Sequence, residues 1–166
     1  RLEEYKGVFD FVAMTKRLPK TLRFVMVGAG SQKDKLRVSG VELRSVSYDD
    51  MPNVYREADI FVAPSKPTKT WEEQYSTVLL EAQAAGLPIV TTRTGGIPEN
   101  IGDAGIVVPP GNVTALTDAV KRFILNPDLR RAYSNKARRR AVRVHDVSIG
   151  ATKLDTLYKH LLSKDP

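Results

Sequence analysis

Residues 73–92 read EQYSTVLLEAQAAGLPIVTT and predict a helix followed by a strand. The residues from Ser76 to Ala85 are apolar around most of the helical circumference, which is typical of a buried helix. Gly86 stands where a helix C-terminal glycine belongs, and residues 87–92 form an apolar run of strand length. This stretch therefore indicates one helix-to-strand unit of an α/β protein.

The same alternation continues on both sides of that unit. Other short β-rich runs lie at 21–27, 41–46, 59–63 and 106–108. Helical patterns begin at Gly7, at Ser31 (running toward Val38), at Asp50, at Asn112 or Val113, at Asp128 and at Ser148, while Gly95–Pro98 is typical of a turn. Alternating strands and helices predict right-handed crossovers and a parallel sheet that helices cover on both faces. The predicted fold class is α/β, a Rossmann-like doubly wound parallel sheet with a helical C-terminal tail, forming one domain over residues 1–166.

Composition limits the chemistry. The chain has 166 residues, 42% of them hydrophobic and 27% charged, and no cysteine, which excludes disulfides, thiolate catalysis and cysteine-ligated zinc. A chain without cysteine fits a reducing cytoplasm. His145 and His160 lie far in sequence from any acidic cluster, so we expect no metal site. The formal charge of +7 favours anionic partners such as phosphates or an anionic membrane surface.

The helix that begins at Ser76 carries the main candidate site. Ligands bind at the carboxyl ends of strands in open parallel sheets, so the loops after the predicted strands are the places to search. The first N–H groups of this helix are free and favour a phosphate, and the hydroxyls of Ser76 and Thr77 can add donors. Glu81 lies roughly 7–8 Å further along the helix axis. That is about the reach of a nucleoside from its diphosphate, so Glu81 could accept bonds from both ribose hydroxyls.

Glu73 lies on the other side of the predicted phosphate position. A carboxylate there repels phosphates unless it holds hydroxyl groups, so a sugar suits it. The alternative is that Glu73 is an ordinary loop carboxylate and Glu81 a solvated helix residue. Against this alternative, the helix is apolar nearly all round, and a carboxylate buried within it needs a partner.

Five segments stand in order along the chain: RLEEYKG at 1–7, DIFVAPS at 59–65, the two glutamates Glu73 and Glu81 with seven residues between them, GLP at 86–88, and TRTGGIPE at 92–99. Together they resemble the C-terminal domain of glycosyltransferase family 4 (group 1), which is one half of the GT-B fold. The resemblance runs from Arg1 to about Tyr158. Ser76 departs from it, because the family usually has a glycine at that position.

The resemblance implies a role for each matching residue. Glu73 would hold hydroxyls of the donor sugar, and Glu81 would hold the ribose. Arg1 and Lys6 would form a cationic clamp that neutralises the leaving diphosphate. The backbone amides near Tyr75, Ser76 and Thr77 would bind the same diphosphate.

Two further positions complete the expected nucleotide site. The base is expected to pack near Val46, and Gly28 would let its turn pass close to the bound nucleotide or would simply form the turn. Gly28-x-Gly30 could also begin a dinucleotide-binding motif, but its third glycine would fall on Lys33. A nicotinamide-dependent dehydrogenase is therefore disfavoured.

The resemblance also implies an activity. We expect a retaining transferase that moves a hexose from a nucleoside-diphosphate sugar, with UDP or GDP as the nucleotide, to a glycan or lipid-linked acceptor. The donor is a co-substrate, and no other cofactor or metal is expected. We expect an N-terminal acceptor domain before Arg1 and little transfer by this chain alone. The alternatives are a stand-alone nucleotide-sugar-binding or regulatory module, or another GT-B enzyme such as a sugar-nucleotide epimerase or a glycogen-type synthase.

Four arginines, Arg138, Arg139, Arg140 and Arg143, lie on one predicted helix. They form either a solvated face or a contact with anionic lipid. Because no aromatic residues are interleaved with them, we do not expect a nucleic-acid platform. We expect a cytoplasmic protein, peripheral on the inner membrane face if the lipid interpretation holds.

Overall fold

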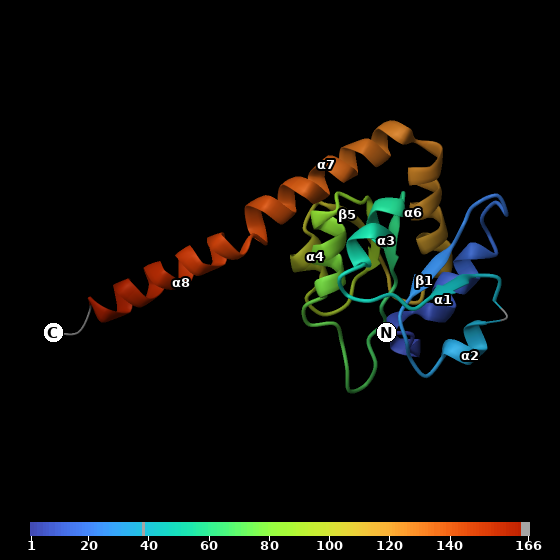
Figure 1. Ribbon diagram of the computed structural model, residues 1–166, viewed down its shortest axis with the longest axis horizontal. Helices are drawn as coiled ribbons and strands as arrows, with labels where there is room; N and C mark the ends of the chain where they lie inside the picture. Colours follow the sequence, from blue (N-terminus) through green and yellow to red (C-terminus); the bar gives the residue numbers. More distant parts are fainter. Residues whose placement is uncertain (38, 164–166) are drawn as a thin grey trace.

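The computed structural model describes residues 1–37 and 39–163 and shows an α/β fold (Figure 1). The strands are β1 (Val25–Val27), β2 (Glu42–Arg44), β3 (Phe61–Ala63), β4 (Ile89–Thr92) and β5 (Gly105–Val108). The helices are η1 (Glu4–Lys6), α1 (Val8–Thr15), α2 (Lys33–Leu36), α3 (Met51–Glu57), α4 (Thr77–Ala84), α5 (Ile97–Ile101), α6 (Val113–Leu125), α7 (Pro127–Val144) and α8 (Val147–Leu162). The predicted fold class is confirmed. The helix predicted to run toward Val38 ends at Leu36, and Val38 lies outside the described residues.

The strands form two parallel sheets rather than the single sheet predicted. β1 pairs with β2, and β3, β4 and β5 form the other sheet in that order. Between β1 and β3 lies a cavity of about 880 Å³, lined by residues of both strands. Apolar side chains along it, such as those of Phe24 and Val62, are therefore only partly buried. The alternating sequence pattern identified the strands but did not determine which of them pair.

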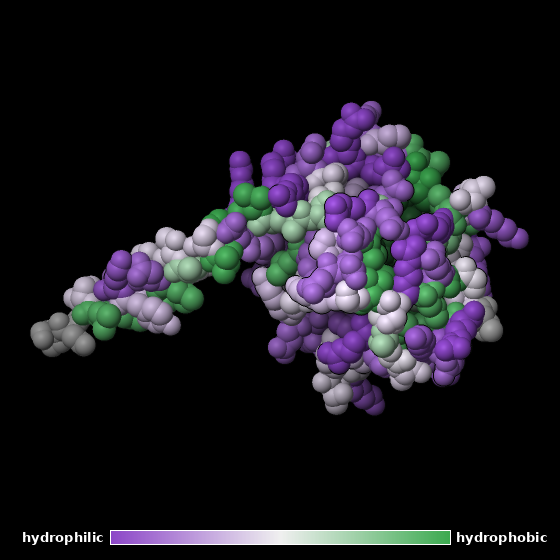
Figure 2. Space-filling view, in the orientation of Figure 1, coloured by the Kyte–Doolittle hydropathy of each residue, from purple (hydrophilic) through white to green (hydrophobic). Residues whose placement is uncertain are grey.

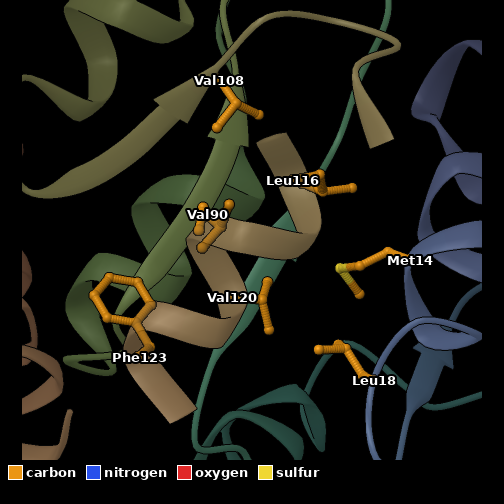
Figure 3. Packing of buried hydrophobic residues seen from close by; sticks show 8 residues of the cluster. Met14, Leu18, Val90, Val108, Leu116, Val120 and Phe123 are labelled. Atoms are coloured by element: carbon orange, nitrogen blue, oxygen red, sulfur yellow. The ribbon is translucent and has the colours of Figure 1, made fainter. Parts of the chain in front are cut away.

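Helices cover both faces of the larger sheet. Val90 and Val108 face α1 and α6, where Met14, Val120 and Phe123 complete one apolar cluster (Figure 3). Ile89, the neighbour of Val90 on β4, belongs instead to a cluster with residues of α3, α4 and α5. Successive side chains of a strand point to opposite faces, so these two clusters show a doubly wound sheet. A third cluster packs α1 and α2 against the smaller sheet.

Several helix starts differ from the sequence prediction. Asn112 caps α6 as predicted, but α7 begins after Asn126, whose side chain accepts a bond from Leu129 N–H at 2.9 Å. The hydroxyl of Ser31 does not cap α2, because it donates to Glu3 at 2.6 Å instead. α8 begins after Asp146, which caps it through Ser148 N–H.

The long α8 extends away from the rest of the molecule (Figure 1). None of its residues is buried, and hydrophobic side chains lie along it beside polar ones (Figure 2). Within residues 1–37 and 39–163, no helix combines the length and the apolar character needed to cross a membrane.

Candidate functional site

The centre of the candidate site is an ion pair between Lys6 and Glu73. Lys6 Nζ lies 2.5 Å from Glu73 Oε2, and Ser65 Oγ donates to the same oxygen at 3.3 Å. Glu73 is 8% exposed although it lies in an irregular loop. A buried carboxylate needs a charged or hydrogen-bonding partner, and η1 and the end of β3 supply both. Two residues that are 67 positions apart in sequence therefore meet at one place.

The loop that carries Glu73 is fastened to the start of the chain. The rings of Trp71 and Tyr5 lie 4.4 Å apart, and Lys6 Nζ lies 4.7 Å from the centre of the Trp71 ring. Lys66 N–H donates to the carbonyl oxygen of Tyr5 at 2.7 Å. The position after Lys6 must be a glycine, because a Cβ on Gly7 would lie 1.9 Å from the carbonyl oxygen of Pro64. The lysine and glycine of the opening segment are thus held against the loop by direct contacts.

Gly95 and Gly96 support the same loop from the other side. Gly96 N–H donates to the carbonyl oxygen of Glu73 at 2.8 Å, and Gly95 N–H donates to the Glu72 carboxylate at 3.1 Å. A Cβ on Gly96 would lie 2.2 Å from the carbonyl oxygen of Gln74. The sequence predicted a turn over Gly95–Pro98, whereas α5 already starts at Ile97, inside that stretch. Paired glycines at a strand end signal close backbone approach, which could have indicated this support.

The N-terminus of α4 lies next to this loop. Ser76 is its N-cap residue, but the Ser76 side chain makes no capping bond, so the first amides of the helix keep their capacity to bind an anion. Ser76 is buried, whereas Tyr75 and Thr77 are exposed. Asn100 Nδ2 donates to the Ser76 carbonyl oxygen at 3.4 Å, which ties the start of α4 to α5.

Six of the nine residues predicted from the sequence line one cavity, the one between β1 and β3. They are Arg1, Lys6, Glu73, Tyr75, Ser76 and Thr77. Gly28 lies beside it, since a Cβ on Gly28 would be 3.7 Å from the backbone nitrogen of Arg1. Neither Val46 nor Glu81 lines this cavity. The structure therefore groups the residues predicted for the sugar and the diphosphate, and leaves those predicted for the base and the ribose outside that group.

Glu81 has a partner that the sequence analysis missed. Tyr55 Oη, on α3, donates to Glu81 Oε2 at 2.6 Å, and Tyr55 lines the cavity. Burial of the phenol, and then its bond to Glu81, raise the pKa of Tyr55 above its ordinary value. The sequence offers no signal that pairs these two residues, because the contact depends on how α3 packs beside α4.

The arginine-rich helix α7 differs from its prediction. Arg138 Nη1 donates to the carbonyl oxygen of Ala84, at the end of α4. Arg140 donates to the carbonyl oxygens of Asn100 and Glu99, near the end of α5, at 2.8 and 2.6 Å. Cations stabilise the carbonyl end of a helix, so these two arginines bind the protein itself rather than forming a purely solvated or lipid-facing surface.

Among the described residues, no three or more histidine, aspartate or glutamate side chains lie close enough together to hold a metal ion.

Comparison with known proteins identifies the family of this chain. Residues 1–126 match the family of group 1 glycosyl transferases. The chain is 33% identical to a D-inositol 3-phosphate glycosyltransferase of Corynebacterium jeikeium, over 80% of this chain and 33% of that protein. It is 30% identical to a glycogen synthase of Mycobacterium tuberculosis, over 95% of this chain and 40% of that protein. The chain thus spans less than half the length of these curated relatives.

Solved structures show the same fold. The Anabaena protein Alr3699/HepE, in complex with UDP-glucose, superposes with a TM-score of 0.82 at 22% identity, over 96% of this chain and 47% of that one. A sucrose-phosphate synthase of Thermosynechococcus elongatus superposes with a TM-score of 0.78 at 23% identity, over 99% of this chain and 44% of that one. At these identities the likeness shows the fold, which is half of a GT-B glycosyltransferase. Together with the family match over residues 1–126, it shows that this chain belongs to the group 1 glycosyl transferases.

Proposed function

We propose that this chain is the donor-binding domain of a retaining glycosyltransferase that transfers a hexose from a nucleoside-diphosphate sugar. The observation that carries the proposal is the contact between Lys6 and Glu73, 2.5 Å apart and next to the N-terminus of α4. One cationic and one anionic side chain therefore lie beside a helix end that favours phosphate. A diphosphate joined to a polyhydroxylated sugar fits this arrangement, because the diphosphate matches Lys6 and the helix end, and the sugar hydroxyls match Glu73.

The chemistry follows from these groups. Transfer requires stabilisation of the negative charge that develops on the leaving diphosphate. Lys6, Arg1 and the first amides of α4 supply positive charge and donors for it. Glu73 accepts hydrogen bonds from sugar hydroxyls, and binding of the diphosphate draws Lys6 toward the phosphates and frees the Glu73 carboxylate for that role. Glu81 holds the ribose, and Val46 lies near the base.

The donor and acceptor are proposed from the relatives. One neighbouring structure contains UDP-glucose, which makes UDP the first nucleotide to test, followed by GDP. Because the chain spans only 33% and 40% of two relatives, we propose that a further, N-terminal domain binds the acceptor and that this chain alone binds donor without transferring it. The acceptor is a glycan or a lipid-linked molecule. A glycogen-type synthase is a second candidate, favoured by the match over 95% of the chain.

We propose a location at an anionic membrane face from two exposed arginines of α7, Arg139 and Arg143. It would place the protein in the cytoplasm, peripheral to the inner membrane face. Co-sedimentation with vesicles containing anionic lipid tests it. Loss of sedimentation after Arg139→Ala and Arg143→Ala is expected, and equal sedimentation with neutral vesicles would contradict it.

The function is tested by comparing UDP-glucose with UDP in calorimetric titrations of the chain and of Glu73→Gln. We expect the substitution to weaken UDP-glucose binding by roughly tenfold or more, since a bond to a charged group is lost, and to spare UDP. Glu99→Gln is the matched control, because Glu99 is exposed on α5 and outside the cavity. Equal effects of Glu73→Gln on both ligands would refute the assignment of Glu73 to the sugar.

A further inference from the structure

We propose that Tyr55 is a positioning residue that holds Glu81 in the orientation that accepts ribose hydroxyls, and so makes the site selective for ribonucleotides. The inference rests on the proposed donor site. Its starting point is the bond from Tyr55 Oη to Glu81 Oε2, 2.6 Å long, which joins α3 to α4.

Tyr55 is suited to hold another side chain because its own ring is fixed. The residue is 6% exposed and belongs to the apolar cluster that contains Leu79 and Ile97. Its ring centre lies 5.9 Å from that of Phe61 on β3. The position of the hydroxyl is therefore set by the packing of α3 against its neighbours rather than by solvent.

Tyr55 donates this hydrogen bond and Glu81 accepts it. The raised pKa of Tyr55, caused first by burial and then by Glu81, keeps the phenol protonated, so it donates and Glu81 accepts. An ionised carboxylate offers about four lone-pair positions. Within residues 1–37 and 39–163, no other group donates to the Glu81 carboxylate, so Oε1 keeps its capacity to accept from a ligand.

The placement of Glu81 fits this role. It is only partly buried, in the second turn of α4, four residues beyond Thr77. Four residues correspond to roughly 6 Å along a helix axis, which separates a diphosphate at the helix start from a ribose at Glu81.

Orientation matters because an unrestrained glutamate samples several rotamers and its terminal carboxylate turns over a broad range. Ordering a side chain when a ligand binds weakens affinity, and ordering it beforehand removes that cost. Tyr55 orders the Glu81 carboxylate before the ligand binds. Removing the Tyr55 hydroxyl therefore weakens the binding only of ligands whose ribose hydroxyls bind Glu81.

The test uses calorimetric titration of the 166-residue chain with UDP, GDP and ADP and with the 2′,3′-dideoxy form of each. Tyr55→Phe keeps the ring and its packing but removes the hydroxyl. Tyr133→Phe is the matched control, because Tyr133 is a partly buried tyrosine on α7, 5.2 Å from Phe123 and outside the cavity. Urea unfolding of each variant shows that it is folded before titration.

We expect the wild-type chain to bind at least one ribonucleotide more tightly than its dideoxy form. Tyr55→Phe should weaken binding of that ribonucleotide by roughly 2- to 12-fold, which corresponds to the cost of ordering one side chain on binding, and should leave binding of the dideoxy form unchanged. Tyr133→Phe should change neither. An unchanged preference in Tyr55→Phe would overturn the positioning role and leave the donor site standing. If the wild-type chain bound none of the ribonucleotides, the donor site itself would be refuted, and the positioning role with it.

Discussion

Replacing Gly96 with alanine should displace the loop that carries Glu73. Gly96 has a φ of −79°, which alanine adopts readily, so the effect is steric. A Cβ at this position would lie 2.2 Å from the carbonyl oxygen of Gln74, and such contacts essentially never fall below 3.0 Å. The loop must therefore move by about 0.8 Å or more, which breaks the bond of 2.8 Å from Gly96 N–H to the Glu73 carbonyl oxygen. The lost bond costs about 1 kcal/mol, and overpacking adds about 1–3 kcal/mol.

Urea unfolding followed by circular dichroism measures this change. We expect Gly96→Ala to lower the free energy of unfolding by about 2–4 kcal/mol, and to weaken the binding of a nucleotide sugar more than that of the bare nucleotide. Gly150→Ala is the matched control, because Gly150 lies inside α8 with nothing within 4 Å of a Cβ. It should be neutral or stabilise by up to about 1 kcal/mol. A Gly96→Ala variant within about 0.5 kcal/mol of the wild type would refute the close contact.

Two further predictions concern the core and the pH dependence of stability. Phe123→Ala should cost about 3–5 kcal/mol in urea unfolding, because the ring is fully buried, whereas Leu125→Ala, 80% exposed on the same helix, should change stability by less than about 0.5 kcal/mol. Burial lowers the pKa of His145 below its ordinary value of 6.5, so the unfolded chain binds the extra proton first, and stability is lost as pH falls from about 6.5 through the folded-state pKa. His145→Gln should flatten the fall in melting temperature between pH 7.5 and 5.5, and an undiminished fall would contradict this; His160→Gln, on the exposed face of α8, should leave the fall unchanged.

Much of the fold could be predicted because local patterns decide it. The apolar run before Gly86 and the strand after it were located within a few residues, since helix and strand periods differ and a glycine separates them. Local patterns did not predict which strands lie side by side in a sheet. β1 and β3 have ordinary strand sequences, and nothing in either sequence shows that a cavity separates them.

The candidate site was predicted in part for a similar reason. Glu73 and Ser76 were predicted from the known chemistry of a helix start after a strand, and the structure places both along one cavity. Tyr55 was missed because its partner is 26 residues away, and no sequence spacing reports that α3 packs beside α4. Arg138 and Arg140 were assigned to a surface, whereas each binds backbone carbonyls of other helices. Partners of long side chains are set by tertiary packing, and a single sequence does not contain that information.

Titration of the chain with UDP, GDP and ADP, repeated with Glu81→Ala, tests most directly whether it contains a nucleotide-sugar donor site. We predict that one of the three binds more tightly than the others and that Glu81→Ala weakens it by roughly tenfold or more, as expected when bonds to a charged group are lost. Binding of none of them, or equal binding of all three that Glu81→Ala leaves unchanged, would contradict the donor site.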